Sequence, residues 1–213
     1  GLTTTGATVL TGIELLPKAI LYYRQQLQWL GGMGIIVLAV AILPMLGVGG
    51  MQLYRAETPG PVKDNKMTPR IADTAKHLWY IYLALTIACA LAFFLAGMSW
   101  FDAVCHSFSA IATAGFSTHS TSVAFFDSAL IEMILVVFMF LGAMNFGLHF
   151  MALRKGRFVA YWRDPELRFF ALSLLLLIGL VTVSLWVQSP MAPLDSLRHT
   201  IFISTSLLTT TGL

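Results

Sequence analysis

Residues 101–118 read FDAVCHSFSAIATAGFST, and the rest of the chain is interpreted from this stretch. About a dozen helix-compatible residues of mixed polarity lead into Thr113, Ala114 and Gly115, where the glycine relaxes the backbone and makes a continued helix unfavourable. The stretch therefore predicts a short re-entrant helix that ends in a loop.

The same loop recurs at both ends of the chain. Residues 1–6 read GLTTTG and residues 207–212 read LLTTTG, and both align with the central loop without a gap when the glycines are superposed. A single Thr-x-Gly sequence is weak evidence, but three aligned copies indicate an internal repeat. The equivalent residues are Thr4, Thr5 and Gly6 in the first loop, Thr113, Ala114 and Gly115 in the second, and Thr210, Thr211 and Gly212 in the third.

The composition is that of a membrane protein. Apolar residues make up 57% and charged residues 11% of the chain, whereas soluble proteins average about 45–50% and 25%. The basic residues lack the aromatic interleaving of a nucleic-acid surface, so nucleic acid is not expected as a partner. Cys89 and Cys105 have a spacing typical of neither a metal site nor a disulfide framework.

Four apolar stretches are each long enough for a membrane-spanning helix, and they cover residues 29–51, 78–100, 128–150 and 169–187, of which the third contains one charged residue, Glu132. Two polar linkers, 54–77 and 154–168, hold ten of the 13 Lys and Arg residues. The positive-inside rule places these linkers in the cytoplasm and the three loops on the outer face. The linker charges have two explanations, contact with anionic lipid headgroups or docking of a regulatory partner.

These observations predict an all-α integral membrane protein with a repeated order of membrane helix, re-entrant pore helix, filter loop and membrane helix. The expected units are 1–53 (end of repeat 1), 54–77 (linker), 78–153 (complete repeat 2), 154–168 (linker) and 169–213 (start of repeat 3). LGGM at 30–33 and LGAM at 141–144 also match, although any membrane helix can carry such small residues. Because the chain starts and stops within copies of the loop, we expect an excerpt of a longer protein that is stable only within it.

The loops suggest a cation filter. Non-helical backbone at membrane depth is tolerated only where protein buries it or a water-filled cavity receives it. Several such loops on one side would direct main-chain carbonyls toward one axis, where carbonyls replace the hydration shell of a cation. The threonine hydroxyl can add a further oxygen ligand, and carbonyl sites suit large monovalent cations.

The sequence resembles the TrkH branch of the Trk/Ktr/HKT superfamily of potassium transporters across essentially its whole length. The matching stretches include GLTTTGATVLTG, HSFSAIATAGFSTHS, YWRDPE and LLTTTG. The resemblance implies a potassium-channel-like fold of four repeats around one pore, in a multi-pass homodimer of the bacterial inner membrane. It also implies potassium uptake regulated by a cytosolic nucleotide-binding ring subunit of the TrkA type, and it leaves open whether transport is channel-like or an ion-driven symport.

Carried over residue by residue, the resemblance implies potassium binding at all nine loop residues named above, with no cofactor in this chain. Ala114 departs from the threonine found at the middle position of the other two loops, which costs nothing if the ligand is the carbonyl. The fourth filter segment, the glycine-rich gate loop of the third repeat and the pore-facing basic residue of the fourth repeat are not in these 213 residues.

Other ionisable residues have more than one reading. Asp102 and His106 are four residues apart and could form a proton relay, or His106 could anchor the re-entrant helix through a hydrogen bond. Glu132 could attract cations or cap a helix, and His149 is expected at the cytoplasmic interface. The sequence has no HExxH and no Ser/His/Asp arrangement, so an enzyme is not expected. The alternatives kept are a less selective channel that also passes sodium and a non-conducting membrane scaffold.

Overall fold

The computed structural model describes residues 1–42, 71–155, 159–188 and 193–213, and every regular element among them is helical. The prediction of an all-α membrane fold is confirmed. The elements are η1 (Ile13–Leu15), α1 (Lys18–Ile42), α3 (Ile71–Leu95), α4 (Trp100–Ile111), η2 (Ser122–Phe126), α5 (Ala129–Ala143), α6 (Phe146–Lys155), α7 (Val159–Arg163), α8 (Pro165–Gln188) and α9 (Pro193–Leu208).

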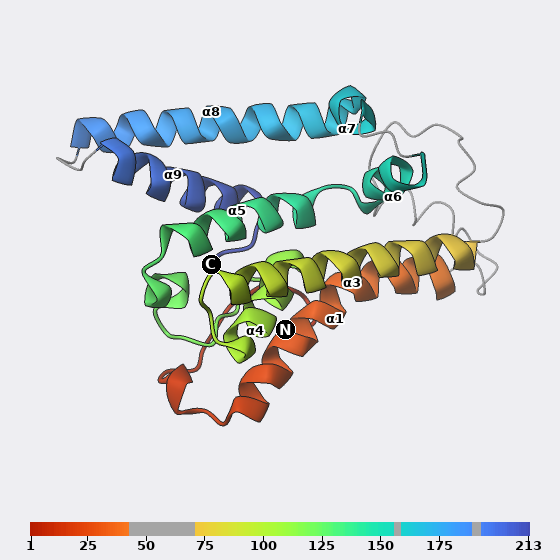
Figure 1. Ribbon diagram of the computed structural model, residues 1–213, viewed down its shortest axis with the longest axis horizontal. Helices are drawn as coiled ribbons and strands as arrows, with labels where there is room; N and C mark the ends of the chain where they lie inside the picture. The colour runs from red at the N-terminus through yellow and green to blue at the C-terminus, as the bar shows by residue number, and fades with distance from the viewer. Residues whose placement is uncertain (43–70, 156–158, 189–192) are drawn as a thin grey trace.

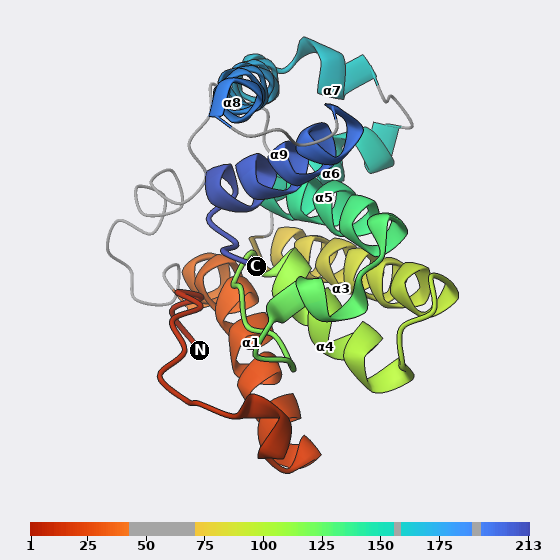
Figure 2. The ribbon, with the colours of Figure 1, turned by 90° about the vertical axis from the view of Figure 1, so that its left-hand side faces the viewer.

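The short helix α4 lies beside α1 and α3 (Figure 1). It packs against α1, α3 and α5, and α9 bridges α5 and α8. A view turned by 90° shows α8, α9, α5 and α3 stacked in that order (Figure 2). The apolar core includes Phe93 of α3, Ala103 of α4 and Leu135 of α5, all fully buried.

Among the described residues, two helices are each long and apolar enough to cross a membrane, at Ala75–Leu95 and Pro165–Val187. The second span starts and ends earlier than the expected 78–100, because Gly97 turns the chain at a φ of 102° and Ser99 then caps α4. The fourth span begins at Pro165 rather than residue 169, because Asp164 caps it by accepting a hydrogen bond from Leu167 N–H at 2.8 Å.

The expected third span, 128–150, is not one straight helix. It is divided into α5 and α6, which are bent by 92°. The backbone is extended at Met144, and Asn145 Oδ1 caps the new helix by accepting a hydrogen bond from Gly147 N–H at 2.9 Å. His149 Nε2 lies 3.0 Å from the Leu141 carbonyl at the end of α5, which also accepts a hydrogen bond from Met144 N–H at 3.3 Å. His149 is therefore buried within the protein at the bend.

The first membrane helix also differs from its expected form. α1 runs without interruption from Lys18, eleven residues before the predicted start at Trp29. The Trp29 ring stacks on Phe108 of α4 at 5.2 Å, and its Nε1–H donates to Thr86 of α3 at 3.0 Å. Trp29 thus joins three helices. The end of this predicted span and most of the first linker, residues 43–70, lie outside the described residues.

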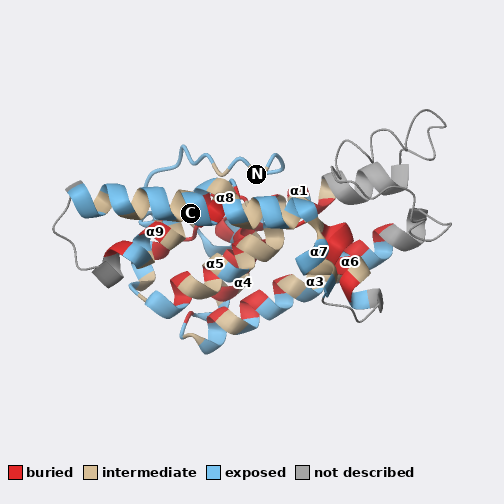
Figure 3. Cartoon of the chain, turned by 90° about the horizontal axis from the view of Figure 1, so that it is seen from above, coloured by how far each residue is buried: buried red, intermediate tan, exposed pale blue. Residues whose placement is uncertain are grey.

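The helix α8 is the least covered of the spans. None of its most apolar window is buried, whereas 39% of the corresponding window of α3 is buried. Figure 3 shows this difference as a pale exposed surface along α8. The buried part of the molecule is therefore centred on α4 and its neighbours, where the three loops lie.

Candidate functional site

The three predicted loops have the same backbone conformation. Their first threonines are left-handed, with φ of 51° at Thr4, 47° at Thr113 and 60° at Thr210. Their glycines are also left-handed, with φ of 72° at Gly6, 81° at Gly115 and 72° at Gly212. The middle residues Thr5, Ala114 and Thr211 are not left-handed, so the conformation alternates along each loop.

One backbone hydrogen bond closes the turn in every copy. The N–H of the first threonine donates to the carbonyl three residues earlier, at 2.9 Å in loop 1, 3.3 Å in loop 2 and 3.0 Å in loop 3. The acceptors are the carbonyls of Gly1, Ala110 and Leu207. The sequence alignment of the three loops therefore corresponds to one shared turn.

The left-handed threonines were not expected from the sequence, which pointed to Gly115 as the residue that ends the helix. Thr113 N–H donates to Ala110 and Ala114 N–H donates to Ser109 at 3.0 Å, which is the Schellman pattern of a helix end. That pattern normally has glycine at the left-handed position. A β-branched residue there is a conformational outlier, and such strain clusters at functional sites.

The loops contact one another in sequence order through their glycines. A Cβ on Gly6 would coincide with the carbonyl oxygen of Ala114 in loop 2, and a Cβ on Gly115 would coincide with the carbonyl oxygen of Thr211 in loop 3. Each of these glycines is therefore required twice, for its positive φ and for the close approach of the next loop. The structure thus brings the three sets of predicted site residues together.

The middle threonine side chains form hydrogen bonds within their own loops. Thr5 Oγ1 lies 2.9 Å from Thr3 Oγ1 in loop 1, and Thr211 Oγ1 lies 2.8 Å from Thr209 Oγ1 in loop 3. Loop 2 has alanine at both equivalent positions, 112 and 114, so both hydroxyls of the pair are missing there. Where the middle residue is a threonine, its hydroxyl bonds the threonine two residues earlier in the same loop.

The first threonine of each loop differs in this respect. Within the described part of the chain, the hydroxyls of Thr4, Thr113 and Thr210 make no hydrogen bond, and none of these three residues is buried. Three equivalent hydroxyls are therefore available to a ligand.

Two glutamines of α1 hold the backbone just after the second loop, and the sequence interpretation missed them. Gln25 Nε2 donates to the Phe116 carbonyl at 3.0 Å, and Gln28 Oε1 accepts from Phe116 N–H at 3.2 Å. Gln28 Nε2 closes the ring by donating to Gln25 Oε1 at 3.1 Å. The missed signal was a pair of glutamines three residues apart, which share one helix face.

The backbone after the third loop is held differently. Leu213 N–H donates to Ser206 Oγ at 3.0 Å, and Ser206 Oγ lies 3.3 Å from the Leu213 carbonyl. Ser109 is the equivalent serine of repeat 2, six residues before its loop glycine, and its buried hydroxyl has no partner among the described residues.

The N-terminal end of α4 is tied to the segment after loop 2. Ser99 accepts a hydrogen bond from Asp102 N–H at 3.1 Å and donates to its carboxylate at 2.7 Å, and Thr118 donates to the other carboxylate oxygen at 2.7 Å. A carboxylate at a helix N-terminus is also favoured by the helix dipole. Asp102 therefore acts as a structural anchor.

His106 has the anchoring role that was one of its two readings. Its Nδ1 lies 2.8 Å from the main-chain carbonyl of Asp102, and its Nε2 lies 3.0 Å from Ser117 Oγ. Because a carbonyl only accepts, Nδ1 carries the hydrogen and Nε2 accepts from Ser117 in the neutral ring. His106 does not contact the Asp102 carboxylate, so the structure gives no direct relay between them. His119 Nε2 lies 3.3 Å from that carboxylate, within ion-pair distance but without hydrogen-bond geometry.

Glu132 is already paired. Arg198 of α9 donates through Nε and Nη2 to the two carboxylate oxygens of Glu132 at 2.7 and 2.8 Å. The contact joins α5 to α9. Its charge is therefore offset within the chain, which weakens the interpretation of Glu132 as a cation attractor.

Small residues let each returning helix approach its own loop. A Cβ on Gly31 of α1 would overlap the Leu2 carbonyl, and a Cβ on Gly142 of α5 would lie 2.8 Å from the Ile111 carbonyl. Leu2 and Ile111 are equivalent residues, each four before its loop glycine. The LGGM and LGAM similarity thus corresponds to the same packing contact in two repeats.

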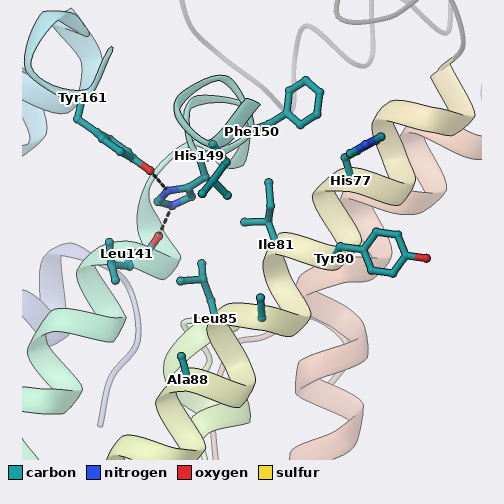
Figure 4. Close-up of a pocket in the computed structure, with 11 residues that line it drawn as sticks. His77, Tyr80, Ile81, Leu85, Ala88, Leu141, His149, Phe150 and Tyr161 are labelled. Atoms are coloured by element: carbon teal, nitrogen blue, oxygen red, sulfur yellow. Dashed lines mark hydrogen bonds between the residues drawn. The ribbon is translucent and has the colours of Figure 1, made fainter. Parts of the chain in front are cut away.

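A separate cavity of about 820 Å³ lies between α3 and the bend of α5 and α6 (Figure 4). Its lining is mostly apolar, with Ile81, Leu85 and Phe150 among the residues drawn. His149 lines it too, with its Nδ1 2.8 Å from Tyr161 Oη. None of the loop residues lines this cavity, so it is distinct from the candidate site.

Comparisons with known proteins agree on one family. The model of the family described as "TrkH: Cation transport protein" matches residues 1–213. Similar curated proteins are named "Trk system potassium uptake protein TrkH", at 62% identity in Halomonas elongata, 60% in Vibrio parahaemolyticus and 56% in Escherichia coli. The alignments cover 99 to 100% of this chain but 44% of each relative.

A solved structure agrees with these matches. It is described as the crystal structure of the potassium transporter TrkH from Vibrio parahaemolyticus, with a TM-score of 0.81 and 54% sequence identity. The match covers 97% of this chain and 41% of that one. The chain therefore spans less than half the length of the relatives it matches.

Proposed function

Because this chain belongs to the TrkH family of cation transport proteins, we propose that it forms part of the pore of a potassium uptake protein. The three loops supply main-chain carbonyls to a selectivity filter, and potassium binds there after losing its water. The proposed ligand-bearing residues are Thr4, Thr5, Gly6, Thr113, Ala114, Gly115, Thr210, Thr211 and Gly212.

The observation that carries this proposal is the shared, alternating backbone of loops that touch through their glycines. Alternating left-handed residues turn successive carbonyls toward the same side, which an ordinary extended strand does not do. Three equivalent loops in mutual contact then present several carbonyls to one small volume. The C-terminal ends of α4 and α9 lead into loops 2 and 3, and the negative end of a helix dipole favours a cation.

The side chains support the proposal that the ligands are mainly main-chain carbonyls. The hydroxyls of Thr5 and Thr211 bond to neighbouring threonines, and Ala114 has none, so the middle position contributes through its carbonyl. The unpaired hydroxyls of the first threonines can add one oxygen per loop. Potassium favours such neutral oxygen ligands, and within the described residues no group of His, Cys, Asp or Glu suits a metal ion.

The wider organisation belongs to the same proposal. The chain holds the end of repeat 1 (1–53), a complete repeat 2 (78–153) and the start of repeat 3 (169–213), joined by linkers 54–77 and 154–168. The family resemblance supports a homodimer in the bacterial inner membrane, with loops outside, basic linkers in the cytoplasm and control by a TrkA-type nucleotide-binding subunit. The chain itself needs no cofactor, and potassium is the transported ion.

The test is ion flux into liposomes that contain the full-length parent protein. Wild type should pass potassium and rubidium and exclude most sodium. Gly115→Ala should reduce this discrimination, because the new Cβ would displace the Thr211 carbonyl. Gly179→Ala, in the open part of α8, is the control and should behave as wild type.

The alternatives predict other results. Equal potassium and sodium flux in wild type would support the less selective channel, and no cation flux would support the scaffold. Unchanged selectivity in Gly115→Ala would remove the second loop from the filter.

A further inference from the structure

We propose that Gln25 and Gln28 form a clamp through which repeat 1 sets the direction of a filter carbonyl in repeat 2. The inference rests on the proposed function, since it assigns these two glutamines as positioning residues for the Gly115 carbonyl. Neither belongs to the loops.

The clamp is a closed ring of three hydrogen bonds. Gln25 and Gln28 together satisfy both backbone polar groups of Phe116, and the two amides bond each other at 3.1 Å. Gln25 is 1% exposed and Gln28 0%, so water does not compete for these bonds. Buried amides with all partners aligned hold their geometry firmly, because losing one partner leaves a desolvated polar group unpaired.

The geometry of one peptide bond connects the clamp to the filter. Phe116 N–H and the Gly115 carbonyl belong to the same peptide group, which is trans. In a trans peptide the N–H and C=O point in opposite directions. With the N–H held toward Gln28 on α1, the Gly115 carbonyl is turned away from α1. The orientation of this proposed ligand is thus determined by a side chain of another repeat.

The third loop shows that another arrangement is available. There Ser206, from the same repeat, bonds both backbone groups of Leu213, the residue after Gly212. Repeat 2 has the equivalent Ser109, but its hydroxyl is unpartnered while the glutamines occupy the Phe116 backbone. The second loop is therefore oriented from repeat 1 although its own repeat contains a serine at the equivalent position.

A third contact holds the Phe116 side chain. The Arg24 guanidinium lies over the Phe116 ring, 4.6 Å from its centroid, and Arg24 Nη2 donates to Thr8 Oγ1 at 3.2 Å. Arg24 and the two glutamines lie within about one turn of α1. One turn of the returning helix thus fixes both the backbone and the ring of the residue after the filter glycine.

The test compares potassium-to-sodium flux ratios in liposomes containing full-length parent protein. Gln28→Met removes both bonds of Gln28, and Gln25→Met removes the donor to the Phe116 carbonyl. Each should lower the ratio by about tenfold, which corresponds to losing about one buried hydrogen bond. Gln28→Glu keeps the acceptor for Phe116 N–H and should lower it less.

Gln26→Met is the matched control, because Gln26 is half-buried and makes no hydrogen bond within the described chain. Its ratio should equal that of wild type. A wild-type protein without potassium selectivity would overturn the proposed function itself. A selective wild type with unchanged ratios in folded Gln25→Met and Gln28→Met would overturn only the clamp. Failure of both variants to fold while Gln26→Met folds would make the glutamines stability elements and would also overturn it.

Discussion

Ser206 and Ser109 occupy equivalent positions six residues before their loop glycines, yet only Ser206 hydrogen-bonds the backbone that follows its glycine. We expect Ser206→Ala in the full-length parent to lower the free energy of unfolding by about 1–3 kcal/mol, because the Leu213 N–H loses its partner. Ser109→Ala should be neutral or slightly stabilising, since it removes a buried hydroxyl that is already unpaired. Thermal unfolding in detergent measures both, and equal losses would contradict the distinction.

The ion pair of Glu132 and Arg198 should contribute to stability only as a pair. The side chains are 11% and 27% exposed, respectively. Glu132→Gln should cost on the order of 1–3 kcal/mol, because it removes the carboxylate charge that faces the partly buried Arg198 guanidinium. The double variant Glu132→Leu with Arg198→Met should recover most of that loss. A double variant less stable than Glu132→Gln would refute this account.

Glu14 and Ser120 provide a pH-dependent contact between the segments that follow loops 1 and 2. Ser120 N–H and Oγ–H donate to the two carboxylate oxygens of Glu14 at 2.6 and 2.7 Å. These bonds, led by the one from the backbone, lower the pKa of Glu14 from 4.5 to about 2. Because the folded-state pKa lies below the unfolded value, the stabilisation is present above pH 4.5 and is lost as the pH falls toward 2.

The melting temperature of Glu14→Gln, compared with wild type, measures this contribution. The difference in melting temperature should be small, because the carboxylate is exposed. It should be constant from about pH 7 to about pH 5 and become smaller at lower pH. Ser120→Ala should reduce the pH dependence only in part, because it removes the hydroxyl bond and keeps the backbone bond to Glu14. A difference that grows on acidification would contradict the assignment.

Gly142→Ala tests the approach of α5 to the end of α4. The added Cβ would lie 2.8 Å from the Ile111 carbonyl, so the backbone must move. We expect overpacking to lower the free energy of unfolding by about 1–3 kcal/mol and thereby to lower the melting temperature. Gly179→Ala has open space and should be stabilising by up to about 1 kcal/mol, because alanine favours the helix. A Gly142→Ala protein as stable as Gly179→Ala would show that the contact is loose.

The sequence predicted the helical membrane fold and the equivalence of the three loops, because both depend on patterns that are local. Apolar runs predict helices that can span a membrane, and the Thr-x-Gly spacing aligns without reference to neighbours. It did not predict left-handed threonines, since β-branched residues disfavour positive φ. Considered alone, Thr113 would be expected to have a negative φ. The surrounding turn imposes the positive φ that is observed.

Other features depended on partners distant in sequence. Arg198 is 66 residues from Glu132, so its neutralising effect was invisible in the local pattern. The partner of Gln25 and Gln28 is the backbone of Phe116, about ninety residues away, so no local pattern indicated their role. The bend at Asn145 was also missed, because the length of the stretch 128–150 matched that of one membrane-spanning helix.

The packing of each loop glycine against the next carbonyl also limits how duplicated copies can diverge. The middle side chain is constrained mainly within its own copy, so threonine pairs could give way to Ala112 and Ala114 without a change elsewhere. Gly6 and Gly115 are instead constrained by the backbone of the following copy. A duplicated repeat can therefore vary its middle side chains independently, whereas replacing its glycine would require the new residue to adopt a positive φ and the backbone of the neighbouring copy to move as well.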